Sequence, residues 1–476
     1  MKYFLGLSSQ YKTADVFRHT FALGDEYFLS ELRAYLAARY GATVDHVAVY
    51  ANGRTALSVA LKALTKRGGK VVVTSLTCYA VVQAVKSAGL VPIFADVDRD
   101  TLHFGADELE KALEGEKDVQ AVIVQNNLGI PVDIKSIEKV AKAHKLEIIE
   151  DLAHCAGVKY ADGREVGTVG RAAVLSFGKG KSIDTITGGA VVFTNPMDAP
   201  VTQPENLPAK SEILRARFYP LLSLVIRAGY MLYPAVGKAL TAGFMKMHAI
   251  KRSADGVVDP KLRLTYWQCR LALSKLQSLP RRGAGPIRKF YLVEDREDLL
   301  NRLEKAGYYF RDIWYTTPVA PERYFRKADF HPEACPVATE LAKKIINVPT
   351  WYSDTELKSA MNIIEEHITG KPVEEPAEEK PAKKSTKKSK KKLNLRPLKK
   401  TKKDSEKEPK VEEPKKEEPK KEEPRTGARG DLVSDQASPK IAKGNAVMRQ
   451  APKKLTDREK LKLELEKGKK EGPSVI

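Results

Sequence analysis

Cysteine is scarce in this chain of 476 residues, which has four, at positions 78, 155, 269 and 335. They stand far apart, with no CxxC pair and no histidine at metal-ligand spacing. A disulfide framework and a zinc site are therefore not expected, and we predict no metal site. This cysteine usage fits a reducing compartment, so we expect a cytoplasmic protein.

Long uninterrupted hydrophobic runs are also absent. The first ten residues have too short an apolar stretch for a signal peptide, so we expect no export. The most apolar region, Arg217–Met247, is interrupted by Arg227 and Lys238, and we expect Pro220 and Pro234 to break helices there. No stretch approaches the ~20 apolar residues of a membrane-spanning helix.

Two interpretations of this apolar region are open. The first, which we favour, is a pair of helices in the core or at a dimer interface. The second is a helix in the plane of a membrane, which would make the protein peripheral. The second is motivated by the basic residues at both ends of the region, which are Arg215, Arg217, Lys246, Lys251 and Arg252.

The last part of the chain has almost no aromatic or β-branched residues. Residues 371–476 hold 33 Lys and Arg against 20 Asp and Glu, a net charge of +13 out of +21 for the whole chain. Such a segment cannot bury enough apolar surface to offset its ordering entropy. We predict a disordered Lys/Glu/Pro-rich basic tail over 370–476, with one short helix near Leu455–Lys467. Its role would be solubilising, or a weak contact with a membrane surface or another polyanion. Sequence-specific nucleic-acid binding is not expected, because no interleaved aromatics could stack on bases.

Short β-branched runs alternate with helical periodicity from about residue 45 onward. The predicted strands are His46–Tyr50, Lys70–Thr74, Val91–Val97, Val119–Gln125, Leu146–Asp151, Ala172–Phe177 and Gly189–Thr194. The predicted helices are Glu26–Ala38, Thr55–Lys66, Tyr79–Ala88, Ala106–Leu113 and Ile134–His144. This alternation predicts an α/β fold whose mostly parallel central sheet has helices on both faces.

Residues 198–260 break this rhythm, and mixed helical and strand-like segments follow up to about His367. We therefore predict a large α/β domain over 1–260, with an apolar insert at about 198–260. A small C-terminal α+β domain over 261–369 and the tail over 370–476 follow it.

Asp151 closes one predicted strand, and Lys181 follows the next one thirty residues later. Open α/β sheets bind their ligands at the carboxyl ends of such strands. An amine and a carboxylate side by side on this edge suit pyridoxal 5'-phosphate (PLP). Lys181 could hold the aldehyde as a Schiff base, and Asp151 could keep the pyridine nitrogen protonated. Lys179 is a rival for the Schiff base, because spacing from the strand alone does not separate the two lysines.

A second motif, Asn52-Gly53-Arg54-Thr55, follows the first predicted strand and opens a helix. Gly53 allows close backbone approach, and the amides of a helix start attract a phosphate. The sequence Gly178-Lys179-Gly180-Lys181-Ser182 invites comparison with a P-loop, which needs a glycine where Leu175 stands. ATP or GTP binding by this loop is therefore disfavoured.

Together with Ala88-Gly89, Asp151-x-Ala153-His154, Ser176-x-x-x-x-Lys181 and Gly188-Gly189, these motifs resemble the DegT/DnrJ/EryC1/StrS aminotransferases. These are PLP-dependent sugar aminotransferases of fold type I, and the resemblance runs from about Gly24 to His367.

The resemblance implies a role for each site residue. Lys181 would bind the PLP aldehyde, and Asp151 would pair with the pyridine nitrogen. His154 stands where the family usually has a glutamine near the phenolic oxygen, and Ser176 would hold the phosphate with Gly53 and Arg54. Three positions depart from the family: Arg54 replaces a threonine, Cys78 with Tyr79 replaces the ring-stacking aromatic, and Lys261 replaces an asparagine that reaches across the dimer.

The implied function is transfer of an amino group from glutamate or glutamine to a keto group of a nucleotide-linked sugar, in amino-sugar or polysaccharide biosynthesis. A homodimer is also implied. Two alternatives stay open: a PLP-dependent sugar dehydratase or isomerase, and a catalytically degenerate binding or assembly module.

Overall fold

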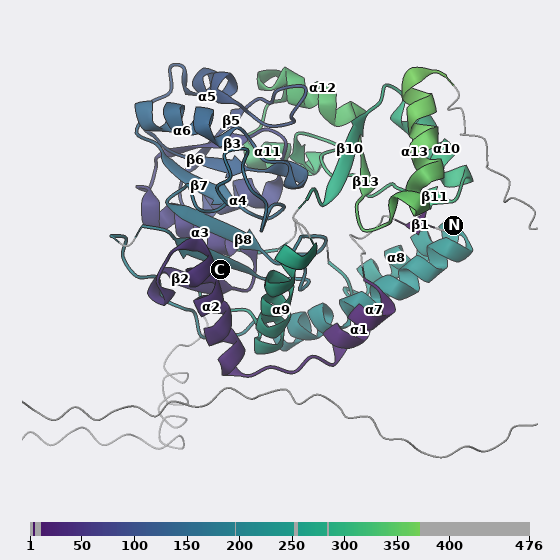
Figure 1. The fold of residues 1–476 in the computed structure, drawn as a ribbon, viewed down its shortest axis with the longest axis horizontal. Coiled ribbons are helices and arrows are strands. Elements are labelled where there is room, and N and C mark those ends of the chain that lie inside the picture. The colour runs from purple at the N-terminus through teal and green to yellow at the C-terminus, as the bar shows by residue number, and fades with distance from the viewer. Residues whose placement is uncertain (1–2, 5–10, 196, 252–255, 283–284, 372–476) are drawn as a thin grey trace, which may run out of the picture. The chain divides into compact units, whose positions relative to one another are not determined.

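The structure, a computed structural model, describes residues 3–4, 11–195, 197–251, 256–282 and 285–371. Its centre is a seven-stranded sheet in the order β2-β9-β8-β7-β6-β3-β5 (Figure 1). The strands are β2 (Val47–Tyr50), β3 (Lys70–Thr74), β5 (Val91–Ala95), β6 (Val119–Gln125), β7 (Glu147–Asp151), β8 (Ala172–Ser176) and β9 (Gly189–Phe193). Strand β9 is antiparallel to both neighbours, and the other neighbouring pairs are parallel. The predicted mostly parallel sheet is confirmed, and each predicted strand end lies within two residues of the observed one.

The strands form where short runs of Val, Ile and Ala can be buried on both faces of a parallel sheet. Val71–Val73 in β3 and Ala121–Val124 in β6 are completely buried. Polar residues follow at the carboxyl ends of the central strands, where Gln125, Asp151 and Ser176 are the last residues of β6, β7 and β8. This edge of the sheet therefore gathers polar side chains above an apolar core.

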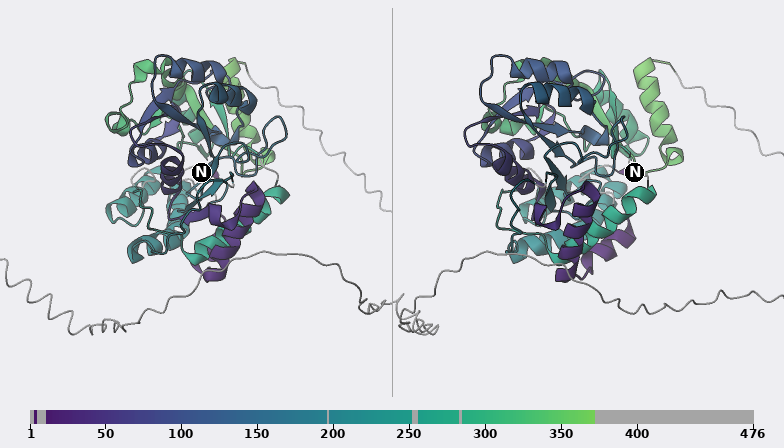
Figure 2. Two further views of the ribbon diagram at one scale, coloured as in Figure 1. Left: turned by 90° about the vertical axis from the view of Figure 1, so that its left-hand side faces the viewer. Right: turned by 60° about the vertical axis from the view of Figure 1, so that its left-hand side comes forward.

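Helices cover both faces of the sheet (Figures 1 and 2). One face packs against α2 (Glu26–Tyr40), α5 (Ala106–Leu113), α6 (Ile134–Ala143) and α9 (Tyr266–Arg282). The other face packs against α3 (Gly53–Leu64) and α4 (Tyr79–Ser87). The helices on both faces are as predicted.

The C-terminal described part has its own small apolar cluster. Strand β10 (Arg288–Leu292) pairs antiparallel with β13 (Ile345–Pro349), and α10 (Arg296–Lys305) packs with α13 (Asp354–Thr369). The shorter elements are β1 (Tyr3–Phe4), β4 (Thr77–Cys78), β11 (Tyr308–Tyr309), β12 (Val319–Ala320), α11 (Phe325–Ala328) and α12 (Pro336–Lys344). Helix α9 follows residue 260 in the chain and packs on the large sheet. The domain limits at 260 and 369 stay predictions, and the predicted tail from residue 372 onward, with its short helix, lies outside the described residues.

The apolar insert forms two helices, α7 (Lys210–Leu232) and α8 (Pro234–Lys246), which pack on each other at the lower right of Figure 1. The short helix α1 (Thr13–Thr20) packs on α7. One face of α7 is buried with α1, as expected for a core helix, but the opposite face is exposed. None of the helices in the described part of the chain is long and apolar enough to cross a membrane.

Pro220 does not break a helix, which corrects the prediction from sequence. It lies inside α7, buried beside Tyr219 and Ser223. A proline removes one intrahelical hydrogen bond and crowds the carbonyl one turn earlier. The burial of the α7 face that carries Tyr219 and Ile226 outweighs this local cost. Pro234 does separate two helices, because it occupies the first turn of α8, where its missing N–H has no partner to lose.

Candidate active site

A cavity of about 580 Å³ lies where β7 and β8 end and α3 begins. The residues predicted for the site that line it are Gly53, Arg54, Cys78, Asp151, His154, Ser176 and Lys181. Tyr79 is not among the lining residues, because its ring stacks on Tyr324 with 4.2 Å between centroids. The fold thus brings residues from position 53 to position 181 together at one edge of the sheet.

Asp151 is a buried carboxylate at the end of β7. Its Oδ1 accepts from the Ala153 N–H at 3.0 Å, and its Oδ2 accepts from Gln125 Nε2 at 3.3 Å. Gln125 is itself fixed by the Thr77 hydroxyl, which donates to Gln125 Oε1 at 2.8 Å. Burial raises the pKa of Asp151, while the Ala153 amide and Lys181 act in the opposite direction. The carboxylate is therefore held in one orientation, ready to pair with a cationic group.

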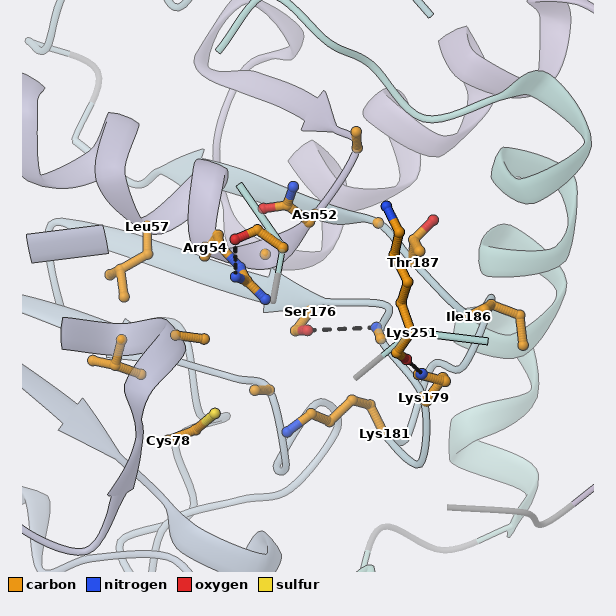
Figure 3. Close-up of a pocket in the computed structure, with 18 of the residues that line it drawn as sticks. Asn52, Arg54, Leu57, Cys78, Ser176, Lys179, Lys181, Ile186, Thr187 and Lys251 are labelled. Carbon is orange, nitrogen blue, oxygen red and sulfur yellow. Dashed lines mark hydrogen bonds between the residues drawn. The ribbon is translucent and has the colours of Figure 1, made fainter. Parts of the chain in front are cut away.

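Lys181 is carried by the loop that follows β8. Gly180 adopts a φ of +74°, a left-handed conformation that favours glycine, and its N–H donates to Asp184 Oδ2 at 2.8 Å. The buried Asp184 also accepts from the Ile186 N–H at 2.8 Å and from the Tyr11 hydroxyl at 2.6 Å. These three donors fix the loop, and the Lys181 side chain then extends toward Cys78 (Figure 3).

The Lys181 amine meets the imidazole of His154, with 2.5 Å between Nζ and Nε2. The Leu128 N–H donates to His154 Nδ1 at 3.1 Å, so the neutral imidazole carries its proton on Nε2 and donates it to the amine. Burial lowers the pKa of both groups, and Lys181 and Arg288 lower that of His154 further. A neutral lysine amine is the nucleophilic form, so this environment suits attack on an aldehyde.

Lys179 is oriented differently. Its Nζ donates to the Lys251 carbonyl at 2.7 Å and lies 4.5 Å from the centre of the Tyr219 ring. In Figure 3 the two lysine side chains leave the loop in different directions. The alternative that sequence spacing left open is therefore disfavoured by the geometry.

Gly53 and Ser176 form a narrow cradle at the other end of the cavity. A Cβ on Gly53 would lie 2.9 Å from Ser176 Cβ and 3.0 Å from its Oγ. Helix α3 begins at Gly53 and is capped by Asn52, whose Oδ1 accepts from the Thr55 N–H at 2.9 Å. The start of a helix favours an anion. Arg54 adds a guanidinium, whose Nη1 donates to Gln83 Oε1 at 2.7 Å and to the Gly256 carbonyl at 2.6 Å. This end of the cavity suits a phosphate group.

We expect the substitution Gly53→Ala to weaken PLP binding at least tenfold and to destabilise the protein by about 1–3 kcal/mol, because the new methyl group overpacks the cradle against Ser176. A titration of the apo-protein with PLP and a thermal melt measure the two effects. The matched control is Gly243→Ala in α8, where an added Cβ meets nothing within 4 Å. It should leave PLP affinity unchanged, and equal affinities of the two variants would contradict the cradle.

Three site residues were not found from the sequence. Trp314 stacks on the His154 ring, with 4.6 Å between centroids, and Lys181 Nζ lies 4.9 Å from the centre of the Trp314 ring. Arg288, 1% exposed, places its guanidinium 3.8 Å from the centre of the Trp314 ring. Tyr315 donates its hydroxyl to Asn127 Oδ1 at 3.0 Å. These residues come from the C-terminal part, and no local motif links them to Lys181.

The groups that line the cavity suit PLP. A phosphate-sized cradle, a buried carboxylate and a buried amine are brought into one cavity by three different loops. In the described residues, no group of three or more His, Cys, Asp or Glu side chains is placed to hold a metal ion.

Comparison with known proteins decides the family. Residues 20–203 match the DegT/DnrJ/EryC1/StrS aminotransferase family. The GDP-perosamine synthase of Escherichia coli O157:H7 is 37% identical over 324 residues, which cover 65% of this chain and 82% of that protein. The chain belongs to the DegT/DnrJ/EryC1/StrS aminotransferase family. The GDP-perosamine synthase of Vibrio cholerae is similar over 342 residues at 24% identity, covering 68% of this chain and 87% of that protein.

Solved structures agree on the fold. A protein of Streptococcus pneumoniae assigned as a sugar aminotransferase, in its PLP form, has a TM-score of 0.54 at 18% identity, covering 77% of this chain and 98% of that one. The E. coli GDP-4-keto-6-deoxy-D-mannose-3-dehydratase with bound hydrated PLP has a TM-score of 0.53 at 16% identity, covering 75% and 97%. The predicted fold type I is confirmed. As a DegT/DnrJ/EryC1/StrS family member, the protein is a PLP-dependent aminotransferase of the sugar aminotransferase family, as predicted.

Proposed function

We propose that the protein transfers an amino group from glutamate or glutamine to a keto group of a nucleotide-linked sugar, in amino-sugar or polysaccharide biosynthesis. The observation that carries this proposal is the buried Lys181 amine in the same cavity as the Asp151 carboxylate and the Gly53–Ser176 cradle. Two relatives, both GDP-perosamine synthases, support a sugar nucleotide as the acceptor.

We assign one task to each residue. PLP, when bound, supplies an aldehyde and an electron-withdrawing ring. Lys181 would hold the aldehyde, and its free amine would carry a proton at Nζ during the transfer. Asp151 would pair with the protonated pyridine nitrogen. Ser176 and the start of α3 would bind the phosphate, and His154 would contact the group at the phenolic position.

The amine of Lys181 favours amino transfer over dehydration. In the family that this chain resembles, loss of the lysine amine often accompanies dehydration, whereas amino transfer uses the amine to move the proton. Lys181 is half-buried, lines the cavity and has its amine 2.5 Å from His154 Nε2, and burial of the amine lowers its pKa. The family membership argues against the alternative of a catalytically degenerate binding or assembly module.

We further propose that the protein is a cytoplasmic homodimer. In the family resemblance, an asparagine of the partner subunit reaches the phosphate, and Lys261 stands at that position. Lys261 is exposed, with its N–H donating to Asp259 Oδ1 at 2.9 Å, so its side chain can reach outward. Light scattering on the purified protein tests this proposal, and a monomeric mass at micromolar concentration would contradict it.

We expect the rate of PLP uptake by the apo-protein to rise with pH and then reach a plateau. The plateau should begin well below the pH at which a free lysine amine becomes neutral. Burial lowers the pKa of Lys181, so its neutral nucleophilic form already dominates at a lower pH. Below that pKa the amine is protonated and uptake slows. Stopped-flow absorbance from about pH 6 to pH 10 measures the rate, with Nα-acetyl-lysine as the reference amine. A rate that follows the reference amine throughout would contradict the lowered pKa.

The proposed reaction is tested with glutamate labelled with ¹⁵N and a set of nucleotide-linked keto sugars. Transfer predicts an amino sugar that carries the label, together with a shift of the cofactor absorbance when glutamate alone is added. A deoxygenated sugar without nitrogen would show a dehydratase instead. The absence of any spectral change with PLP would contradict an active enzyme.

A further inference from the structure

Helix α7 exposes a continuous line of apolar side chains. These residues recur every three or four positions, which places them on one face of the helix. They are Leu214, Phe218, Leu221, Val225, Ala228 and Leu232, and we call them the apolar stripe. The large side chains of the stripe are between 41% and 80% exposed, and none of them is buried. The stripe continues at the turn into α8, where Tyr233 and Val236 are 65% and 39% exposed.

The opposite face of α7 is already covered. Ala216, Tyr219, Ile226 and Tyr230 are buried in a cluster with residues of α1. Helix α7 is therefore apolar on both faces. A surface helix normally shows a polar face to water, and here that face is also apolar. A contiguous apolar face of this kind marks an interaction surface.

The charges around the stripe have one sign. Between Glu212 and Asp255 the sequence contains no acidic residue and seven Lys and Arg. Lys238 and Lys246 are exposed on α8, whereas Arg227 is only half-exposed and lies on the side of α7 away from the stripe. An apolar face with a basic rim is complementary to a bilayer that has acyl chains below anionic headgroups. A symmetric contact between two copies would instead bring the same basic rims together.

The basic character is repeated outside the described residues. Residues 371–476 add a net charge of +13 to the same chain. Basic residues near an anionic membrane surface add electrostatic attraction to the apolar burial of an interfacial helix. The charge of the tail therefore has the sign that an anionic surface requires.

We propose that the α7–α8 hairpin is a docking surface for anionic lipid bilayers. The apolar stripe enters the interface between headgroups and acyl chains, and Lys238 and Lys246 contact lipid phosphates. The helices lie in the plane of the membrane, in agreement with their lack of a spanning segment. This inference concerns where the enzyme works and is independent of which sugar it aminates.

Helix α7 lies between the docking surface and the active-site cavity. Ile213, Ala216 and Tyr219 line the cavity, and they alternate along the same helix turns with Leu214, Phe218 and Leu221 of the stripe. A helix with its side chains is about 10 Å across, so the cavity lies roughly one helix thickness behind the docked face. The catalytic cavity would therefore operate next to the bilayer surface.

A flotation assay with the full-length protein tests the proposal. We use vesicles with about 30 mol% phosphatidylserine in phosphatidylcholine, and pure phosphatidylcholine vesicles as the neutral surface. The wild-type protein should float with the anionic vesicles and at least tenfold less with the neutral ones. The stripe variant Phe218→Gln/Leu221→Gln/Val225→Gln should lose at least tenfold of the anionic binding, because apolar burial in the bilayer is removed.

The matched control replaces three apolar residues of similar exposure that lie away from the hairpin. It is Val44→Gln/Val91→Gln/Ile368→Gln, with exposed fractions of 39%, 46% and 50% in the wild type. The control should bind anionic vesicles like the wild type. The proposal is overturned if the wild type does not float, or if the stripe variant floats as well as the control, since the tail alone would then suffice.

Light scattering tests the other candidate partner of the stripe, a second copy of this chain. If the stripe variant has a smaller assembly mass than the control, the stripe is a contact between copies of this chain, and the lipid proposal fails. Folding of each variant is checked by its thermal melt. Should the triple variant unfold, Phe218→Trp gives a second readout: its fluorescence should be quenched by brominated anionic lipids, and an unquenched signal overturns the proposal.

Discussion

Replacing Lys181 with alanine should lower the amino-transfer rate by about 1000-fold or more, because one side chain both holds the cofactor and moves the proton. The variant should also lose the borohydride-reducible bond between protein and PLP. Peptide mapping of the reduced wild-type protein should place the pyridoxyl label on Lys181 within residues 172–190. Absorbance spectra before and after borohydride treatment give the second measurement.

Lys179→Ala is the matched control, since Lys179 lies two residues away in the same loop. The Lys179 amine donates a hydrogen bond to the Lys251 carbonyl, so removing the Lys179 side chain should leave the reducible bond to PLP intact. If Lys181→Ala retained a reducible adduct and Lys179→Ala lost it, the two assignments would have to be exchanged. If neither variant changed the label, the proposed site would be wrong.

The substitution Asp151→Asn should lower the amino-transfer rate by about 100- to 1000-fold, because a neutral amide cannot hold a positive charge on the pyridine nitrogen. The asparagine keeps the volume of the side chain and can still accept from the Ala153 N–H through its amide oxygen. Its NH₂ group would then face the NH₂ group of Gln125, which donates to Asp151 in the wild type. Steady-state rates and the cofactor absorbance spectrum measure the change.

Gln125→Met serves as the control for this prediction. It removes the second hydrogen bond to Asp151 and leaves the carboxylate in place, so we expect a loss of about tenfold or less. Wild-type rates for Asp151→Asn would show that the charge on Asp151 is not used. Equal losses for both variants would show that orientation, rather than charge, is the contribution of Asp151.

Local patterns predicted the sheet well, for a physical reason that applies to each strand. Val71–Val73 and Ala121–Val124 are buried on both faces, so their apolar character depends little on which neighbour they meet. The ends of these strands then place Asp151 and Ser176 on one edge. Both residues could be chosen from the sequence because strand direction alone decides where a strand's last side chain lies.

Pro220 shows where local reasoning fails. Intrinsic preference predicts a helix break at this residue, whereas the packing of α7 against α1 keeps the helix continuous. The stacking position shows a similar limit. Cys78 lines the cavity, while the Tyr79 ring lies against Tyr324, and only the path of the chain into α4 separates these neighbours.

The sequence by itself determined the α/β alternation, the sheet edge that carries the site, and the family, because these depend on short periodic runs and on motifs of adjacent residues. The tertiary structure decided which lysine meets His154, that Trp314 lies against its amine with Arg288 on the Trp314 ring, and that α7 carries an apolar stripe behind the active-site wall. Each of these depends on contacts between residues far apart in the chain. Such contacts arise only when the whole apolar core is packed, and no local pattern encodes them.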